Sequence, residues 1–226
     1  MKIFVDGPCI DQYIKKISNY LNLKIVGNEP DSNHLLYNEK GLSYVSISSK
    51  NKSILHINFL KGSLGWRMKR SEHESSLKKA IGKHSHQLTI FDATAGQLND
   101  SMIFLSLGHK VVAVEQSKIL YLLVSDAIKR ASKELPILNN LKFVNGNSIE
   151  IFKKDNNQFD LIYLDPMYPI VKKNVKRSGN LNCIKEILSF ENFMNHEDNL
   201  IEDFMNLKYK KIILKRPLKS KNNYSN

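Results

Sequence analysis

The segment Asp165-Pro166-Met167-Tyr168-Pro169 places an acceptor, two prolines and an aromatic ring within five consecutive positions. Asp165 or the Pro166 carbonyl could accept a hydrogen bond from a ring amine, whose delocalised lone pair is weakly nucleophilic, and orient it for attack. The prolines fix the loop, and Tyr168 offers a face on which a base can stack. The segment is thus a candidate for catalysis on an aromatic amine, with Asp165, Pro166 and Tyr168 as the catalytic residues. The alternative is a Pro-bracketed turn in which Asp165 is a cap and Tyr168 covers the core.

Three other polar clusters follow apolar segments that read as strands. In the run 92–100, small residues let the backbone approach a ligand, and the following helix offers free N–H groups. Glu115 could accept both hydroxyl groups of a ribose, and the run 145–148 carries short polar side chains that could contact an adenine edge. Each cluster is also compatible with an ordinary turn or helix cap. Their coincidence at strand ends favours a nucleoside ligand.

The elements that must position these clusters alternate from Leu88 onward between apolar strands and helical stretches. Strands are predicted at 88–94, 110–115, 141–146, 159–166 and 210–217, and helices at 98–107, 118–134 and 184–207. This alternation indicates βαβ units and a buried parallel sheet, which binds ligands at the carboxyl ends of its strands. The first turn lacks the GxGxxG pattern of dinucleotide folds. We predict an α/β, Rossmann-like domain over residues 71–226.

Residues 1–70 show a different pattern, with short apolar runs separated by turn residues at 1–7, 23–26, 34–38, 42–48 and 54–60. Gly41 suits the turn between two of these runs, which favours a hairpin. We expect a small β-rich unit with a basic linker over residues 1–70, joined to the next domain through a helical stretch at 71–81.

Several of these segments resemble motifs of S-adenosylmethionine methyltransferases. DATAG at 92–96 resembles their first motif, and DPMY at 165–168 resembles the (D/N)-P-P-(Y/F) motif of enzymes that methylate exocyclic or amide nitrogens. Together with NFLKGSLGWRMKR at 58–70 and KRP at 215–217, they make the chain similar to the RsmJ family from about Ile57 to Pro217. That family comprises bacterial small-subunit ribosomal RNA guanine-N2 methyltransferases.

The resemblance implies methyl transfer from S-adenosyl-L-methionine to the exocyclic N2 of a guanosine, with 16S rRNA or the small ribosomal subunit as partner. Because the sequence stops soon after Pro217, we expect the last antiparallel strand pair of such a sheet to be incomplete. The residues expected to bind the cofactor, from the strand ends and the resemblance together, are Asp92, Ala95, Gly96, Asn99, Asp100, Glu115, Gln116, Asn147, Ser148 and Asp165.

The charge of the chain fits a polyanionic partner. Lys and Arg number 34 and Asp and Glu 22, a formal net charge of +12, and such a surplus attracts phosphate backbones. A Lys-rich composition can also come from an AT-rich genome. Trp66 could stack on RNA or anchor the two units to each other. The residues predicted to contact RNA are Trp66, Arg67, Lys69, Arg70, Lys172, Lys173, Lys176 and Arg177.

Other classes of protein fit the sequence poorly. No apolar run approaches the roughly 18–20 residues that cross a bilayer, and the first ten residues lack the apolar core of a secretory signal. Cys9 and Cys183 stand alone, and His84 and His86 form the one closely spaced histidine pair. We therefore predict a reduced, cytoplasmic protein without a disulfide or a metal.

Two alternative functions fit the same residues. The segment from Asp165 to Tyr168 suits any ring amine, so the target could be adenine N6 in DNA or RNA. A non-catalytic RNA-binding or assembly factor could also have kept the fold. Cofactor binding separates the enzymes from the assembly factor, and the methylated nucleoside separates the two enzymes.

Overall fold

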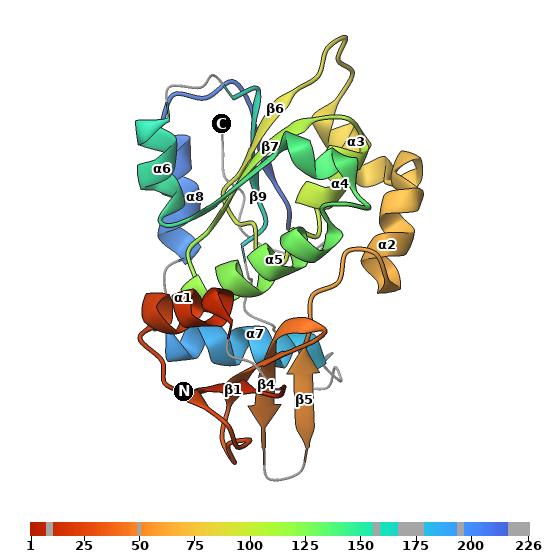
Figure 1. Cartoon of the computed structure of the whole chain (residues 1–226). Helices are drawn as coiled ribbons and strands as arrows, with labels where there is room; N and C mark the ends of the chain where they lie inside the picture. Colours follow the sequence, from red (N-terminus) through yellow and green to blue (C-terminus); the bar gives the residue numbers. More distant parts are fainter. Residues whose placement is uncertain (8–10, 49–50, 156–158, 167–178, 194–196, 217–226) are drawn as a thin grey trace.

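The computed structural model describes residues 1–7, 11–48, 51–155, 159–166, 179–193 and 197–216. These residues form two sheets with helices around them (Figure 1). The sequence predictions for the tail from Pro217 onward lie outside the described residues. The same holds for Tyr168, Lys172, Lys173, Lys176 and Arg177.

The larger half of the chain contains a parallel sheet. Its strands are β6 (Thr89–Asp92), β7 (Lys110–Glu115), β8 (Leu141–Asn145), β9 (Leu161–Leu164) and β10 (Ile212–Leu214). They lie in the order β10-β9-β6-β7-β8, and all paired neighbours are parallel. The predicted Rossmann-like α/β fold is confirmed, because each strand lies where the apolar periodicity of the sequence indicated one.

Both faces of this sheet are buried, and the side chains of successive residues in one strand point toward opposite faces. In β7, Val111 and Ala113 join one apolar cluster, whereas Val112 and Val114 join the other. The first cluster includes residues of α4 (Ser101–Ser106) and α5 (Lys118–Ala131). The second includes residues of α6 (Ser148–Lys154) and α8 (Glu197–Met205). The continuous apolar runs in the sequence therefore reflect a strand that is covered on two sides.

The first part of the chain forms a mixed sheet with β1 (Ile3–Val5), β2 (Ile25–Val26), β3 (His34–Asn38), β4 (Gly41–Ile47) and β5 (Lys52–Leu55). The order is β2-β1-β3-β4-β5; β1 runs parallel to β2 and β3, and the later pairs are antiparallel. The predicted hairpin between β3 and β4 is confirmed. Gly41 has φ +100° there, a conformation that glycine adopts without steric cost.

Neither helix within residues 1–70, α1 or α2 (Gly62–Lys69), was predicted. Helix α1 (Gln12–Leu21) begins after Asp11, whose Oδ1 accepts from Ile14 N at 2.8 Å, and ends at Asn22 with φ 52°. Ile14 and Ile17 are its buried residues. An N-cap aspartate followed by apolar residues three positions apart is a helix signal. The sequence prediction overlooked it among the surrounding strand-like runs.

The connections also differ in part from the prediction. The helical stretch expected at 71–81 is a short turn, η1 (Ser71–His73), followed by α3 (Ser75–Ile81), and α2 (Gly62–Lys69) precedes both. A turn η2 (Pro136–Asn140) leads into β8. The single helix expected at 184–207 is wrong, because α7 (Gly179–Phe190) ends before Asn192, which has φ 61°, and α8 forms separately.

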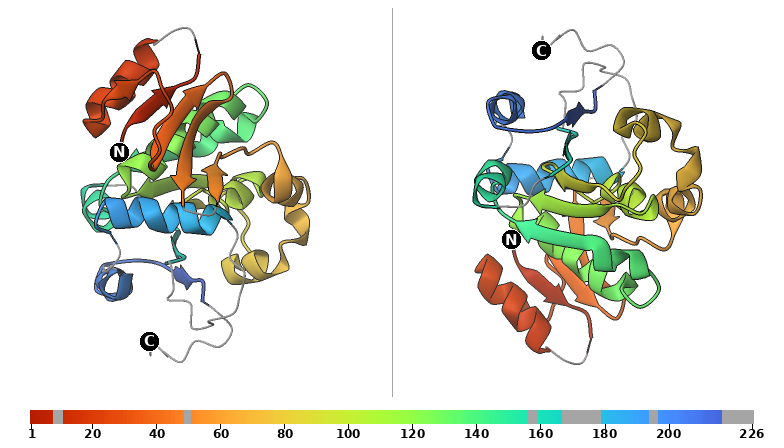
Figure 2. Two further views of the ribbon diagram at one scale, coloured as in Figure 1. Left: turned by 90° about the horizontal axis from the view of Figure 1, so that it is seen from below. Right: turned by 90° about the horizontal axis from the view of Figure 1, so that it is seen from above.

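The mixed sheet packs against the parallel-sheet half through α5 and α7, as the views in Figure 2 show. Asp126 of α5 accepts from Leu42 N at 3.0 Å and from Arg130 Nε at 2.7 Å, and Arg130 donates to the Ile57 carbonyl at 2.6 Å. A Cβ at Gly41 would lie 2.4 Å from Asp126 Oδ2, so this close approach also requires glycine. The division of the chain at residue 70 stays a prediction.

Candidate functional site

A cleft of about 760 Å³ opens at the carboxyl edge of the parallel sheet, where the strand order reverses between β6 and β9. This is the position at which open α/β sheets bind ligands. The structure brings to this cleft Pro166 and every residue expected to bind the cofactor, namely Asp92, Ala95, Gly96, Asn99, Asp100, Glu115, Gln116, Asn147, Ser148 and Asp165.

Glu115 lies at the end of β7 and joins two loops of the cleft. Its Oε2 accepts from Gly96 N at 2.9 Å and its Oε1 accepts from Ser117 N at 2.7 Å. Burial raises the pKa of Glu115 to about 7, although both backbone hydrogen bonds favour the carboxylate. Each oxygen has a second lone pair for a ligand hydroxyl. Gly96 has φ 52°, so the loop takes a turn that favours glycine.

Asp92 fixes the loop after β6. Its Oδ2 accepts from Ser101 Oγ at 2.5 Å and its Oδ1 from Thr94 N at 3.1 Å. Burial raises the pKa of Asp92 to about 6, against these two hydrogen bonds. Thr94 in turn accepts from Asp165 N at 2.7 Å through its Oγ1. The loop after β6 and the loop after β9 are therefore held together directly.

Asp100 is buried at the start of α4 and accepts hydrogen bonds from three other elements. Tyr163 of β9 and Lys215, which follows β10, donate to Oδ2 at 2.7 and 2.6 Å, and Arg67 of α2 donates to Oδ1 at 3.2 Å. Burial opposes ionisation, but the hydrogen bonds from Lys215 and Tyr163 outweigh it and lower the pKa of Asp100. Asp100 is thus an ionised anchor in the wall of the cleft.

Asp165 lies at the rim, directly after β9. Its Oδ2 accepts from Lys215 Nζ at 2.7 Å. Burial raises the pKa of Asp165, and the ammonium of Lys215 opposes that rise. Tyr163 and Lys215 were not predicted as site residues. Lys215 could have been found by applying the strand-end rule to β10 as well as to the other strands.

Another side of the cleft, contributed by α7, α8 and the residues between them, was also missed. Ile184, Leu188 and Phe193 line the cleft there. Glu191 accepts from Lys118 N at 3.0 Å and from Ser117 Oγ, and it thereby caps α5 beside the predicted ribose site. Nothing in the local sequence of α7 signals this, because its position depends on packing against β4 and β5.

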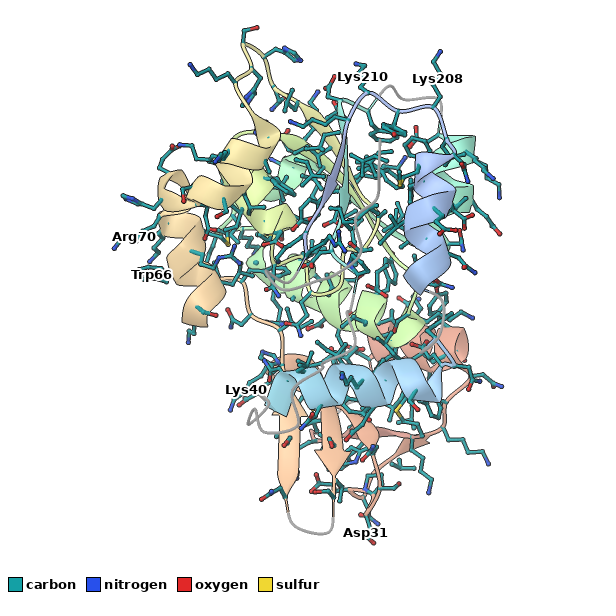
Figure 3. All side chains as sticks on the ribbon, turned by 180° about the vertical axis from the view of Figure 1, so that it is seen from behind. Asp31, Lys40, Trp66, Arg70, Lys208 and Lys210 are labelled. Atoms are coloured by element: carbon teal, nitrogen blue, oxygen red, sulfur yellow. The ribbon has the colours of Figure 1, made fainter. Side chains whose placement is uncertain are left out.

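The predicted RNA-contacting residues on α2 divide into two groups. Arg67 faces the cleft wall, since it donates to Glu74 Oε1 at 2.7 Å as well as to Asp100. Trp66 is 60% exposed, and the Arg70 guanidinium lies 4.8 Å from its ring centroid. Both side chains project outward from α2 in Figure 3. Ser63 of the same helix lines the cleft, so this exposed pair lies next to the site.

The described residues show neither a metal-binding group nor a membrane span. They contain no group of three or more His, Cys, Asp or Glu side chains arranged to hold a metal ion. Within the same residues, none of the helices has the length and apolar character that a membrane span requires.

A parallel sheet in this order, with a carboxylate-lined cleft at its reversal point and no GxGxxG loop, is compatible with a Rossmann-type methyltransferase that uses S-adenosylmethionine (SAM). The family model described as "Putative SAM-dependent methyltransferase" matches residues 16–223. The chain belongs to that family, and within it to the family of ribosomal RNA small subunit methyltransferase J.

Individual relatives support this assignment. The chain is 31% identical over 212 residues to ribosomal RNA small subunit methyltransferase J of Desulfotalea psychrophila, covering 90% of this chain and 80% of that protein. The chain is 28% identical over 213 residues to the protein of the same name from Buchnera aphidicola, covering 92% of this chain and 84% of that protein. The crystal structure of a SAM-dependent methyltransferase from Neisseria gonorrhoeae has the same fold, with a TM-score of 0.70, 23% identity and coverages of 98% and 87%.

The residues of the cleft fit SAM, the cofactor of this family. The volume of about 760 Å³ is in the range for a ligand of this size. The sulfonium and ammonium groups of SAM are cationic, and Asp92 and Asp165 supply the cleft with carboxylates. The same carboxylates would repel the pyrophosphate of a dinucleotide. The chemistry of the donor set therefore favours SAM over a nicotinamide cofactor.

We expect SAM to bind more tightly as the pH rises toward about 7, because the Glu115 carboxyl, with a pKa raised to about 7, accepts hydrogen bonds from the ribose hydroxyls most strongly as a carboxylate. Above that pH the contribution of Glu115 should be constant. Isothermal titration calorimetry between pH 5.5 and 8.5 measures this dependence. Glu115→Gln should weaken binding by roughly ten- to a hundredfold, as for hydrogen bonds to a charged group, and should flatten the profile.

The comparison with Glu115→Gln also serves as the control, because the α-amino group of the cofactor titrates near pH 7.7–8.0. That titration affects both proteins equally, so their difference isolates Glu115. If the two profiles were parallel, Glu115 would have no part in cofactor binding.

Proposed function

We propose that this protein transfers the methyl group of SAM to the exocyclic N2 amine of a guanosine in 16S rRNA. The observation that carries the proposal is the position of Asp165 and Pro166 at the rim of the cofactor cleft. The names of the relatives support ribosomal RNA of the small subunit as the substrate class. With that substrate, the reaction would take place in the cytoplasm.

The cofactor, when bound, supplies an electrophilic methyl group on a positively charged sulfur. The residues of the chain have to orient the amine and stabilise the positive charge that develops on its nitrogen. Asp165 accepts a hydrogen bond from an N–H group of the target amine, and the Pro166 carbonyl is a second acceptor. The nitrogen lone pair then points along the axis of the transferred methyl group, while Tyr168 stacks on the base.

No strong base is required for this reaction. The proton on N2 becomes acidic only as the new C–N bond forms, so it can leave to water or to the Asp165 carboxylate afterwards. Among the described residues that line the cleft there is no histidine. This composition fits a methyltransferase whose main contribution is orientation and electrostatic stabilisation.

RNA binding is proposed for two groups of residues. The first comprises Trp66 and Lys69 of α2 and Arg70, which directly follows it, and the Arg70 guanidinium lies against the exposed Trp66 indole. The second comprises Lys172, Lys173, Lys176 and Arg177, which follow the catalytic segment in the sequence. Phosphate contacts at both would place the target base over the rim of the cleft.

Replacing Lys172, Lys173 and Arg177 together by Gln should reduce the salt dependence of RNA binding. Each phosphate contact contributes about 0.7–0.9 to the slope of log K against log salt, so the slope should fall by about 2–3. Fluorescence anisotropy with a labelled 16S rRNA fragment at several salt concentrations gives this slope. An unchanged slope would mean that these side chains do not contact phosphates.

The proposed activity is tested in cells by nucleoside mass spectrometry of 16S rRNA from a strain that lacks the gene. We expect one N2-methylguanosine to be absent and to return with a plasmid copy. Loss of N6-methyladenosine instead would assign the protein to the alternative target that the segment 165–168 also suits. An unchanged set of methylated nucleosides would favour a non-catalytic role.

A further inference from the structure

We infer that Lys215 is a positioning residue for the methyl transfer, which holds Asp165 as a carboxylate with one oxygen directed at the target amine. The inference rests on the proposed function of Asp165. Lys215 acts through another residue, since its Nζ contacts the carboxylates of Asp100 and Asp165.

The parallel sheet fixes the place of Lys215. Its backbone N donates to the Leu164 carbonyl at 2.8 Å, which continues the pairing of β10 with β9 by one residue. Lys215 therefore stands beside Asp165, the residue after Leu164. Its Nζ lies 2.7 Å from Asp165 Oδ2. Among the described residues, Asp165 Oδ1 receives no hydrogen bond from a side chain, so this oxygen is available to an amine.

Asp100 keeps the ammonium in place. A lysine side chain is flexible, and a single exposed partner would hold it weakly. Here Nζ also donates to Asp100 Oδ2 at 2.6 Å, and Asp100 is only 6% exposed. Tyr163 and Arg67 hold Asp100 in turn. The ammonium is thus fixed between a rigid carboxylate below it and the catalytic carboxylate at the rim.

The charges around Asp165 make this ammonium necessary. Burial raises the pKa of Asp165, and the neighbouring carboxylate of Asp100 raises it further. Lys215 is the positive group that opposes both effects. Without it, the pKa of Asp165 would rise further, and the protonated form, which is a hydrogen-bond donor toward the amine, would be more populated. A protonated carboxyl cannot stabilise the positive charge that develops on the nitrogen.

Further charged groups face this cluster from the elements around it. Asp92 of β6 lies close enough to interact with Asp165, Tyr163 of β9 donates to Asp100, and Arg67 of α2 neutralises Asp100 from the far side. Lys215 itself stays charged: burial lowers its pKa, but the hydrogen bonds to both carboxylates outweigh burial and raise it. Lys215 therefore cannot be the base that removes the product proton.

The direct test is the titration of the Asp165 carboxyl by ¹³C NMR of protein labelled at aspartate Cγ, with the resonance assigned by its loss in Asp165→Asn. In Lys215→Met the pKa of Asp165 should be higher than in the wild type. Lys215→Arg, which keeps the charge, should restore a value near that of the wild type. Lys208→Met removes the same charge from an exposed position far from the cleft and should change nothing (Figure 3).

The second measurement is the single-turnover methylation rate at saturating cofactor and RNA from pH 6 to pH 9. In Lys215→Met the rate loss should be largest at pH 6 and should shrink as the pH rises, because a smaller fraction of Asp165 is then protonated. A purely structural defect would give the same loss at every pH.

The two claims fail in different ways. An unchanged Asp165 pKa in Lys215→Met, or a rate loss that is independent of pH, would overturn the role of Lys215 while methylation by the wild-type protein still supports the proposed function. A wild-type protein that binds SAM but methylates no guanosine, combined with the expected rise of the Asp165 pKa, would overturn the proposed function and leave the electrostatic role of Lys215 intact.

Discussion

Asp165→Ala is expected to slow the single-turnover methylation of RNA by about 10²–10³, the usual cost of losing one preorganised hydrogen bond in a transition state. The acceptor matters most there, because positive charge develops on the amine nitrogen during transfer. Asp165→Asn keeps an acceptor oxygen but loses the negative charge, so we expect an intermediate rate. The assay uses saturating cofactor and RNA, so that binding effects do not enter the rate.

Asp160→Ala is the matched control, because Asp160 precedes the same strand, β9, at the opposite end of the sheet. Its carboxylate accepts hydrogen bonds from Thr89 N at 2.9 Å and from Lys210 Nζ at 2.8 Å. These contacts lie away from the cleft. We expect a near-normal rate for this variant. A near-normal rate for Asp165→Ala as well would show that the target amine is oriented by other groups.

Phe91→Ala is expected to lower the free energy of unfolding by about 3–5 kcal/mol, the range for removing a buried aromatic side chain. Phe91 is 0% exposed and lies in the central strand β6. Its ring centroid is 5.1 Å from that of Phe152, 4.9 Å from Phe159 and 6.1 Å from Phe204. The substitution would leave a cavity in the aromatic cluster on the face of the sheet that α6 and α8 cover.

Urea unfolding followed by circular dichroism measures this change. Phe190→Ala provides the comparison, since Phe190 is 53% exposed at the end of α7 and should alter stability by no more than about 0.5 kcal/mol. Equal effects of the two substitutions would mean that the aromatic cluster around Phe91 is not a principal source of stability.

The sheet and the strand-end residues could be predicted from sequence because their signals are local. A strand covered on two faces must be apolar throughout, and in a parallel sheet the residue after each strand must reach the same edge. These two rules place Asp92, Glu115 and Asp165 at one cleft without any knowledge of long-range packing. The hairpin at Gly41 has a similarly local cause.

The features that were missed depend on contacts between distant parts of the chain. Arg67 joins the site only because α2 lies beside α4, and Glu191 caps α5 only because α7 is held on the mixed sheet. Glu186 of α7 accepts from Tyr44 at 3.1 Å and from Ser46 at 3.0 Å, and no sequence pattern predicts that pairing. Helix α1 is different, because its cap and spacing were readable and the prediction overlooked them.

The central claim is tested most directly by incubating the purified protein with SAM carrying a trideuterated methyl group and small ribosomal subunits assembled from unmodified 16S rRNA. The RNA is then digested to nucleosides and analysed by mass spectrometry. We predict that the label appears in N2-methylguanosine and that Asp165→Ala removes nearly all of it at the same reaction time. Label in N6-methyladenosine, or no label in RNA although the protein binds SAM, would contradict the proposed function.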